Sequence, residues 1–156
     1  MSQQRITIID FGGEPVTTAP EEMARLAGRA FPLGERIAGG TGEAFDFGAW
    51  FANWRNRQGS GPEAPLPTHL KVEAADSFEA LIPWEQLGDA AVLFAQGNAP
   101  LAKNGPIRLY VPNGSSDCLN VKRVVTMRFL HDEARRGEAA FGFKQTFSAD
   151  EMRIKR

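Results

Sequence analysis

Two stretches near the start of the chain have the hydrophobic spacing of amphipathic helices. One helix face is indicated by four aromatic residues at positions i, i+3, i+4 and i+7: Phe47, Trp50, Phe51 and Trp54. Such a stripe is typical of a buried core, and it predicts a helix over about residues 46–57 with Asp46 as its N-cap. An earlier helix is expected after Thr18, because Pro20 suits a first turn and two glutamates follow it.

The second half of the chain alternates between apolar and polar positions, which is the period of a β-strand. Residues 70–74 and 78–82 predict a hairpin around the Asp76-Ser77 turn. Further strands are expected over residues 92–95, 107–111, 121–130 and 141–147. Strict alternation in the longest of them places on one face Val121, Arg123, Val125, Met127 and Phe129. Because helices and strands do not alternate regularly, we expect an α+β fold, mostly β with two or three short helices.

The composition is that of one ordinary globular domain over residues 1–156. Hydrophobic residues make up 42% and charged residues 24%, and the formal net charge of −1 argues against a general nucleic-acid binder. No apolar run approaches the roughly 20 residues of a membrane span, and we recognise no signal peptide, so we expect a cytoplasmic protein. The single cysteine, Cys118, excludes an internal disulfide framework, and we expect a small buried thiol.

Positive charge is concentrated towards the end of the chain. Residues 121–156 contain nine Lys or Arg and five Asp or Glu, whereas acidic side chains are in excess over the first 120 residues. This distribution has two interpretations: solvated strand faces with a basic tail, or a cationic rim for an anionic ligand.

Residues with catalytic chemistry are few and lie in no recognisable motif. The available bases, His69 and His131, stand at the edges of predicted strands, where a histidine is usually exposed. Gly39-Gly40-Thr41-Gly42 follows no clear strand and lacks the lysine of a phosphate-binding loop, so we interpret it as a flexible turn. No spacing of Cys, His and carboxylates favours a metal site.

The segment 111–123 combines a polar loop with cations at the start of the next strand. It offers hydroxyls, an amide and two cations, and its candidate binding residues are Ser115, Ser116, Asn120, Lys122 and Arg123. Such groups can hold an anion through hydrogen bonds and charge. An ordinary connection between two strands is the alternative interpretation.

Four blocks of the second half follow the order and spacing of a known family. They are Ala80–Leu87, Val92–Leu101, Gly105–Pro112 and Asn120–Val124. Over about residues 70–130, the chain thereby resembles the sulfite-oxidase-type molybdopterin-binding domain. The family pattern is a strand and "IP" before a short helix, a turn followed by "PL", a "GxPhRhhhP" strand, and a loop that closes on "hK".

The resemblance implies an α+β fold that cradles a molybdenum-carrying pterin, molybdopterin, and performs two-electron, oxygen-atom-type redox chemistry. It also implies that a basic loop grips the pterin phosphate, with Lys122 at the family's loop lysine and Asn120 beside it. The family's other basic residue of that loop falls at Leu119 here. The metal-binding cysteine of the family belongs to the segment 29–42, which contains none, and Cys118 does not match that position.

Three functions follow from the resemblance. The chain is a divergent member that binds a pterin or another anionic ligand without standard molybdenum catalysis, or an active molybdenum oxidoreductase with an unusual ligand set, or a non-enzymatic domain that binds a protein partner. A soft thiolate is the ligand that such a metal site requires, so its loss favours the first and third functions. A cofactor-free domain is compatible with both.

Overall fold

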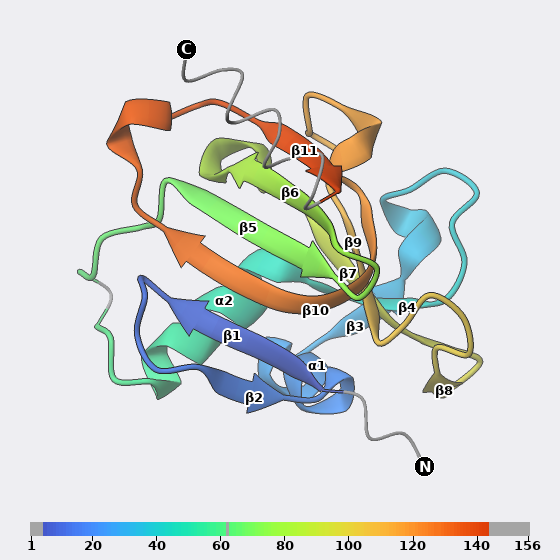
Figure 1. The fold of residues 1–156 in the computed structure, drawn as a ribbon. Coiled ribbons are helices and arrows are strands. Elements are labelled where there is room, and N and C mark those ends of the chain that lie inside the picture. Colours follow the sequence, from blue (N-terminus) through green and yellow to red (C-terminus); the bar gives the residue numbers. More distant parts are fainter. Residues whose placement is uncertain (1–4, 62, 144–156) are drawn as a thin grey trace.

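The computed structural model describes residues 5–61 and 63–143 of the chain, as two helices and a large sheet (Figure 1). The helical elements are α1 (Pro20–Ala27), α2 (Phe47–Arg57) and four 3-10 turns, η1 (Leu33–Glu35), η2 (Trp84–Gln86), η3 (Asp117–Leu119) and η4 (Glu133–Arg135). The strands are β1 (Ile6–Asp10), β2 (Val16–Thr18), β3 (Ala30–Pro32), β4 (Glu43–Asp46), β5 (His69–Ala74), β6 (Phe78–Pro83), β7 (Ala91–Gln96), β8 (Ala99–Pro100), β9 (Ile107–Tyr110), β10 (Val121–Leu130) and β11 (Ala140–Phe143).

All eleven described strands belong to one sheet, whose long path runs β11-β6-β5-β10-β9-β7-β4-β3. The pair β1 and β2 lies beside β10, and β8 lies beside β7. The β1–β10 pair is parallel and the other pairs are antiparallel. The predicted α+β class, mostly β with short helices, is therefore confirmed. None of the helices in the described part of the chain is long and apolar enough to cross a membrane.

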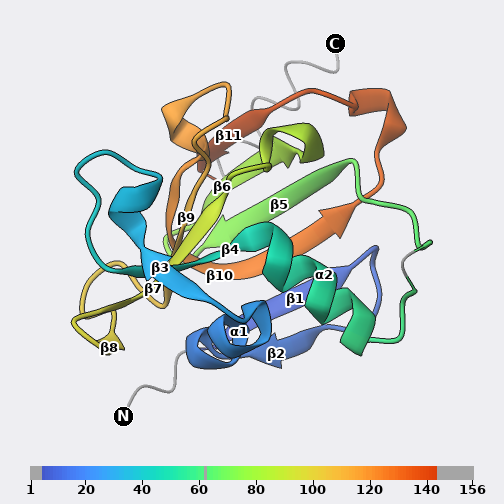
Figure 2. The same ribbon diagram turned by 180° about the vertical axis from the view of Figure 1, so that it is seen from behind.

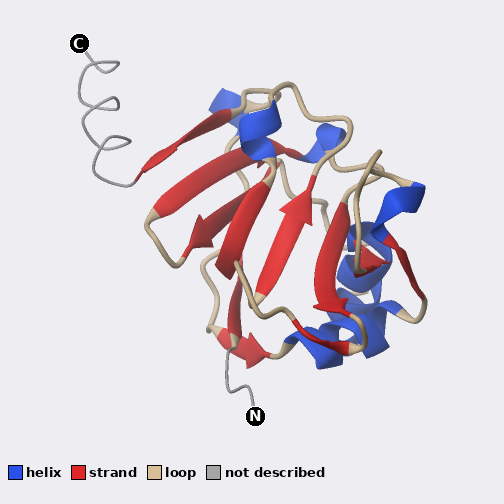
Figure 3. Ribbon diagram, turned by 90° about the vertical axis from the view of Figure 1, so that its right-hand side faces the viewer, coloured by secondary structure: helices blue, strands red, loops and turns tan. Residues whose placement is uncertain are grey.

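The two faces of the sheet are covered differently. Helices α1 and α2 lie together on one face, as the views from front and behind show (Figures 1 and 2), and the sheet fans out beside them (Figure 3). The main core lies under these helices and includes Trp50, Phe129 and Val92. A second cluster packs on the opposite face, since side chains alternate along β4 and β7. Its buried members are Phe31, Leu33, Ala44, Ala91 and Leu93.

Both predicted helices are confirmed, and their starts have different causes. Helix α2 begins after Asp46, whose carboxylate accepts a hydrogen bond of 2.7 Å from the Ala49 N–H. Helix α1 begins after Ala19 without a side-chain cap, and Pro20 occupies the first turn, where its missing N–H is not needed. The aromatic stripe of α2 is buried, as its spacing predicted.

The predicted face pattern of residues 121–130 is wrong in its middle, although the strand has the expected length and Val121, Met127 and Phe129 share the buried face as predicted. The pairing with β9 shifts register between Val121 and Val124, and Arg123 adopts a left-handed φ of 59° there. This bulge moves Val124, rather than Arg123, onto the buried face with Val121. The predicted final strand is present as Ala140–Phe143, and its residues 144–147 lie outside the described residues.

Candidate functional site

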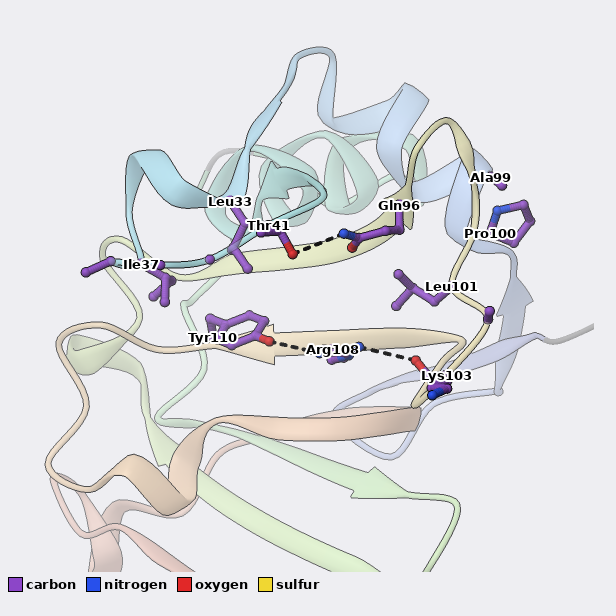
Figure 4. A pocket seen from close by; sticks show the side chains of 14 residues that line it. Leu33, Ile37, Thr41, Gln96, Ala99, Pro100, Leu101, Lys103, Arg108 and Tyr110 are labelled. Carbon is purple, nitrogen blue, oxygen red and sulfur yellow. Dashed lines mark hydrogen bonds between the residues drawn. The ribbon is translucent and has the colours of Figure 1, made fainter.

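A cavity of about 620 Å³ lies on the face of the sheet that the helices leave uncovered (Figure 4). One wall is the loop of residues 37–41 that follows η1, and another is the segment 96–103 around β8. Strand β9 contributes Arg108 and Tyr110, which point to the same side because they are two residues apart. Three segments distant in sequence therefore meet around one space of the size that holds a small molecule.

The charged residues of the cavity are all cationic. Lys103 and Arg108 line it, and none of the described lining residues is acidic. Since the chain as a whole has a net charge of −1, this local excess is a property of the cavity rather than of the composition. A cavity with low-dielectric walls and charge of one sign concentrates ligands of the opposite sign.

The guanidinium of Arg108 is held in place by hydrogen bonds, but not all of its N–H donors are bonded within the described residues. One terminal nitrogen, Nη1, donates to the Tyr110 hydroxyl at 3.3 Å, and Nη2 donates to the Lys103 carbonyl at 3.3 Å. Both distances are beyond the usual range for N–H···O bonds. Its Nε is buried and has no partner in the described part of the chain. Because a guanidinium carries five N–H donors and buried donors are normally paired, this group is suited to an added acceptor.

Apolar side chains form the other side of the cavity. Leu33 belongs to the second cluster, and Ile37, Leu101 and Tyr110 pack against that cluster from the cavity side. The Tyr110 hydroxyl accepts from Arg108, so its ring is anchored at one end by apolar packing and at the other by a hydrogen bond. The cavity thus pairs a cationic end with an apolar surface.

The wall at residues 37–42 depends on glycine, which the sequence analysis did not connect with a site. A Cβ on Gly40 would lie 2.9 Å from Leu33 Cγ, and a Cβ on Gly42 would lie 2.6 Å from Gln96 Oε1. Gly42 also has a φ of +102°, which favours glycine. The Gln96 amide then donates to the Thr41 hydroxyl at 3.0 Å and joins this wall to the opposite one (Figure 4). The density of glycines was the only sequence signal of this wall.

Three of the five candidate residues take part in hydrogen bonds that hold the loop of residues 111–120 in place. The Ser115 N–H donates to Gln86 Oε1 at 2.8 Å, and Ser116 Oγ accepts from the Cys118 N–H at 3.1 Å. The Asn120 side-chain oxygen accepts from the Val111 N–H at 2.7 Å. These bonds are what an ordinary strand connection requires, and none of the three residues lines the cavity.

Lys122 and Arg123 lie nearer to the cavity but not in it. Val121 pairs with Leu109 on the core side, so alternation places the exposed Lys122 on the same face as Arg108 and Tyr110. Arg123 turns away at the bulge, where its Nε donates to Asn104 Oδ1 at 3.2 Å and its Nη1 lies 3.5 Å from an Asp76 oxygen. The structure does not gather the five residues into one site.

Two further expectations about single residues are wrong. His69 is fully buried, with its Nδ1 2.8 Å from Thr68 Oγ1 and its Nε2 3.1 Å from the Glu138 carbonyl, because the chain after β10 folds over it. Cys118 is exposed, because η3 turns its neighbour Leu119 into the core instead. His131 is exposed as expected, and its ring lies 4.1 Å from that of Phe11.

The cavity does not supply the ligands of a metal. No group of three or more His, Cys, Asp or Glu side chains in the described ranges is arranged to hold an ion. Cys118 lies on η3 and does not line the cavity. Comparison of the chain with protein-family models, curated proteins and solved structures finds no significant match.

Proposed function

We propose that this chain is a small-molecule-binding domain whose cavity takes an anionic ligand with a flat or apolar body. The observation that carries the proposal is Arg108, a positioned guanidinium with an unpaired buried Nε in a cavity where the described lining is free of acidic residues. The resemblance to molybdopterin-binding domains makes a pterin phosphate the candidate ligand. Its phosphate would lie at Arg108 and Lys103, and its rings against Tyr110 and Leu101.

The metal half of a molybdenum–pterin cofactor does not fit these residues. The segment 29–42, where the resemblance expects a cysteine, consists of β3, η1 and the glycine wall, and Gly40 and Gly42 of that wall leave no room for a side chain. A molybdenum oxidoreductase would need another thiolate, and Cys118 does not line the cavity. We therefore propose anion binding without assigning a redox step to this chain.

Binding of a protein partner is a second candidate function, and strand β11 favours it. Phe141 and Phe143 are 42% and 51% exposed, and β11 stands at one end of the described strand order. Large apolar side chains on an edge strand are typical of an interaction surface.

A fluorescence titration with neopterin monophosphate and with neopterin tests the first proposal, because the two probes differ only in the phosphate. We expect the phosphate ester to bind the purified chain more tightly. Arg108→Gln should weaken its binding about ten- to a hundred-fold, the loss expected for charged hydrogen bonds. Equal binding of both probes, or unchanged binding by Arg108→Gln, would contradict the proposal.

Two matched variants locate the effect. Arg25→Gln removes an exposed cation on α1, away from the cavity, and should leave the titration unchanged. Lys122→Gln tests whether the ligand binds at the loop of residues 112–123, which the sequence favoured, instead of in the cavity. A loss with Lys122→Gln larger than that with Arg108→Gln would move the site to residues 112–123.

A further inference from the structure

The segment 98–103, here called the strap, forms one wall of the cavity and is the wall held least firmly. Ala99, Pro100, Ala102 and Lys103 are exposed, and only Leu101 is half-buried. The pairing of this segment with the sheet consists of β8, which is two residues long. Few buried contacts and exposed backbone bonds mark a segment that opens at a small free-energy cost.

Residues with left-handed backbone conformations flank the strap. Gly97 and Asn98 have φ values of 60° and 63° at its start, and Asn104 has a φ of 60° just after its end. A Cβ on Gly97 would meet nothing within 4 Å, so the chain has free space at this point. Such positions at the ends of a loop can absorb the backbone rotation of a hinge.

The far end of the strap is fixed and the near end is tied. Beyond it, the Asn104 carbonyl accepts from the Arg123 N–H at 3.0 Å. At the near end, Gln96 donates to Thr41 at 3.0 Å, and the Asn98 N–H donates to Glu43 Oε1 at 3.1 Å. Of these two bonds, the one from Asn98 belongs to the strap itself, and it is exposed, so it is a tie that water can replace.

The strap also carries both kinds of group that the ligand would meet. Leu101 packs against the second cluster, and the Lys103 carbonyl accepts a hydrogen bond of 3.3 Å from Arg108. The cation of Lys103 is therefore brought to the cavity by the strap, whereas Arg108 is fixed on β9. An anion held by Arg108 attracts Lys103 and favours the closed strap.

We infer that the strap is a gate over the cavity, closed by the Asn98–Glu43 hydrogen bond and by Leu101, and opened for ligand entry and release. This inference rests on the proposed binding function. In the open state the strap withdraws Lys103 and Leu101, and in the closed state both complete the site around the anion. The glycine wall at Gly40 and Gly42 stays in place, because close contacts fix it.

Stopped-flow fluorescence with neopterin monophosphate tests the gate. The wild-type association rate should level off at high ligand concentration, because opening then limits it. Glu43→Ala, which removes the acceptor of the Asn98 N–H and does not alter the lining of the cavity, should raise both the limiting association rate and the dissociation rate about two- to ten-fold, the effect of one lost hydrogen bond. The dissociation constant should change by less than about twofold, because the same barrier governs both directions. Leu101→Ala should raise both rates as well.

Gln86→Ala is the matched control, because Gln86 ties a different loop through a hydrogen bond of 2.8 Å to the Ser115 N–H. It should leave both rates unchanged. Hydrogen exchange of the ligand-free protein gives a second readout: Glu43→Ala should speed exchange in peptides covering 97–104, and Gln86→Ala should not.

The outcomes separate the gate from the binding site. Saturable binding that Arg108→Gln weakens, with rates and exchange unaffected by Glu43→Ala and Leu101→Ala, would overturn the gate and leave the proposed function standing. Absence of phosphate-dependent binding in the wild-type protein would overturn both. Equal acceleration by Glu43→Ala and Gln86→Ala would show a general loosening and would also overturn the gate.

Discussion

The two faces of the sheet bury apolar side chains under different covers. On one face, α1 and α2 press an aromatic stripe onto the strands, and Phe129 lies 4.8 Å from the Phe51 ring and 6.2 Å from the Trp50 ring. On the other face, η1, the loop of residues 37–41 and the strap lie over the second cluster. Aromatic rings pack the space beneath α2, and the loop-covered face contains the cavity of about 620 Å³.

The difference shows how one sheet can serve both stability and binding. A helix presents side chains at regular intervals and interdigitates with the strands beneath it. Loops follow their own backbone requirements, such as the glycines of residues 39–42, and leave space that side chains do not fill. Loops on a rigid scaffold are also where binding residues are commonly found. The comparison therefore predicts that substitutions on the first face change stability most, and those on the second change binding.

The largest expected effect is that of Phe129→Ala in the main core. Removing this fully buried ring should lower the free energy of unfolding by about 3–5 kcal/mol, because α2 and the strands cannot collapse into the space. Leu93→Ala in the second cluster should lower it by only about 2 kcal/mol, since the loops above can relax. Urea unfolding of both variants measures the difference. An equal or larger loss for Leu93→Ala would break the comparison.

The next effect concerns the glycine wall. Gly42→Ala places a Cβ 2.9 Å from the Ala95 carbonyl oxygen, in a backbone conformation that only glycine adopts freely. We expect it to lower the free energy of unfolding by about 1–3 kcal/mol and to weaken neopterin monophosphate binding through the displaced wall. Gly39 also has a positive φ, but a Cβ there would meet nothing within 4 Å. Gly39→Ala should therefore lower the free energy of unfolding by about 1 kcal/mol or less. Equal losses for both variants in urea unfolding would show that the close approach of the Ala95 carbonyl to Gly42 does not contribute to the effect.

Asp46 connects the two faces, and its substitution separates their contributions. One carboxylate oxygen caps α2 at the Ala49 N–H, and the other lies 2.7 Å from Arg36 Nη1 on the loop side. Asp46→Ala should lower the free energy of unfolding by about 1 kcal/mol, mainly through the lost cap. Asp46→Asn keeps a capping oxygen and loses only the negative charge beside Arg36. It should therefore lower the free energy of unfolding by less than Asp46→Ala does. Equal losses for Asp46→Asn and Asp46→Ala in urea unfolding would make the ion pair the dominant interaction.

The sequence predicted the helix-covered face far better than the cavity. The spacing of four aromatic residues predicts one helix face, because helical periodicity and the burial that it produces depend on neighbouring residues of the chain. These residues are Phe47, Trp50, Phe51 and Trp54. The length of β10 was predicted in the same way. Its face pattern was not, because the bulge at Arg123 depends on pairing with β9 and on the Asn104 carbonyl. A second register shift, between Val124 and Thr126 in the pairing with β5, restores the predicted face for Met127 and Phe129, so the error is confined to the middle of the strand.

The cavity was missed because no local pattern encodes it. Its walls come from residues 37–41, 96–103 and β9, which only the strand order brings together. The sequence favoured 111–123 because hydroxyls, an amide and two cations stand close together there. In the structure, the Ser116 hydroxyl and the Asn120 amide bond backbone N–H groups of the same segment, and the Ser115 N–H bonds Gln86. Arg108 belongs to the "GxPhRhhhP" block of the sequence. Only its surroundings in the structure make it a candidate for binding.

The smallest effect lies outside both faces, in the exposed pair Glu133 and Arg136. Two hydrogen bonds of 2.8 and 2.6 Å from the Arg136 guanidinium lower the pKa of Glu133 from its ordinary value of 4.5. A carboxylate whose pKa is lower in the folded state stabilises the fold above its unfolded pKa, and this contribution disappears as the pH falls through the folded pKa. Glu133→Gln should therefore shift the urea midpoint slightly at neutral pH and not at all at strongly acid pH. Glu138→Gln, which removes a carboxylate without such a pair among the described residues, should shift it at neither pH. A Glu133→Gln shift of the urea midpoint that persisted at acid pH would come from packing and not from charge. The surface around Glu133 and Arg136 would then resemble the helix-covered face, where packing determines stability.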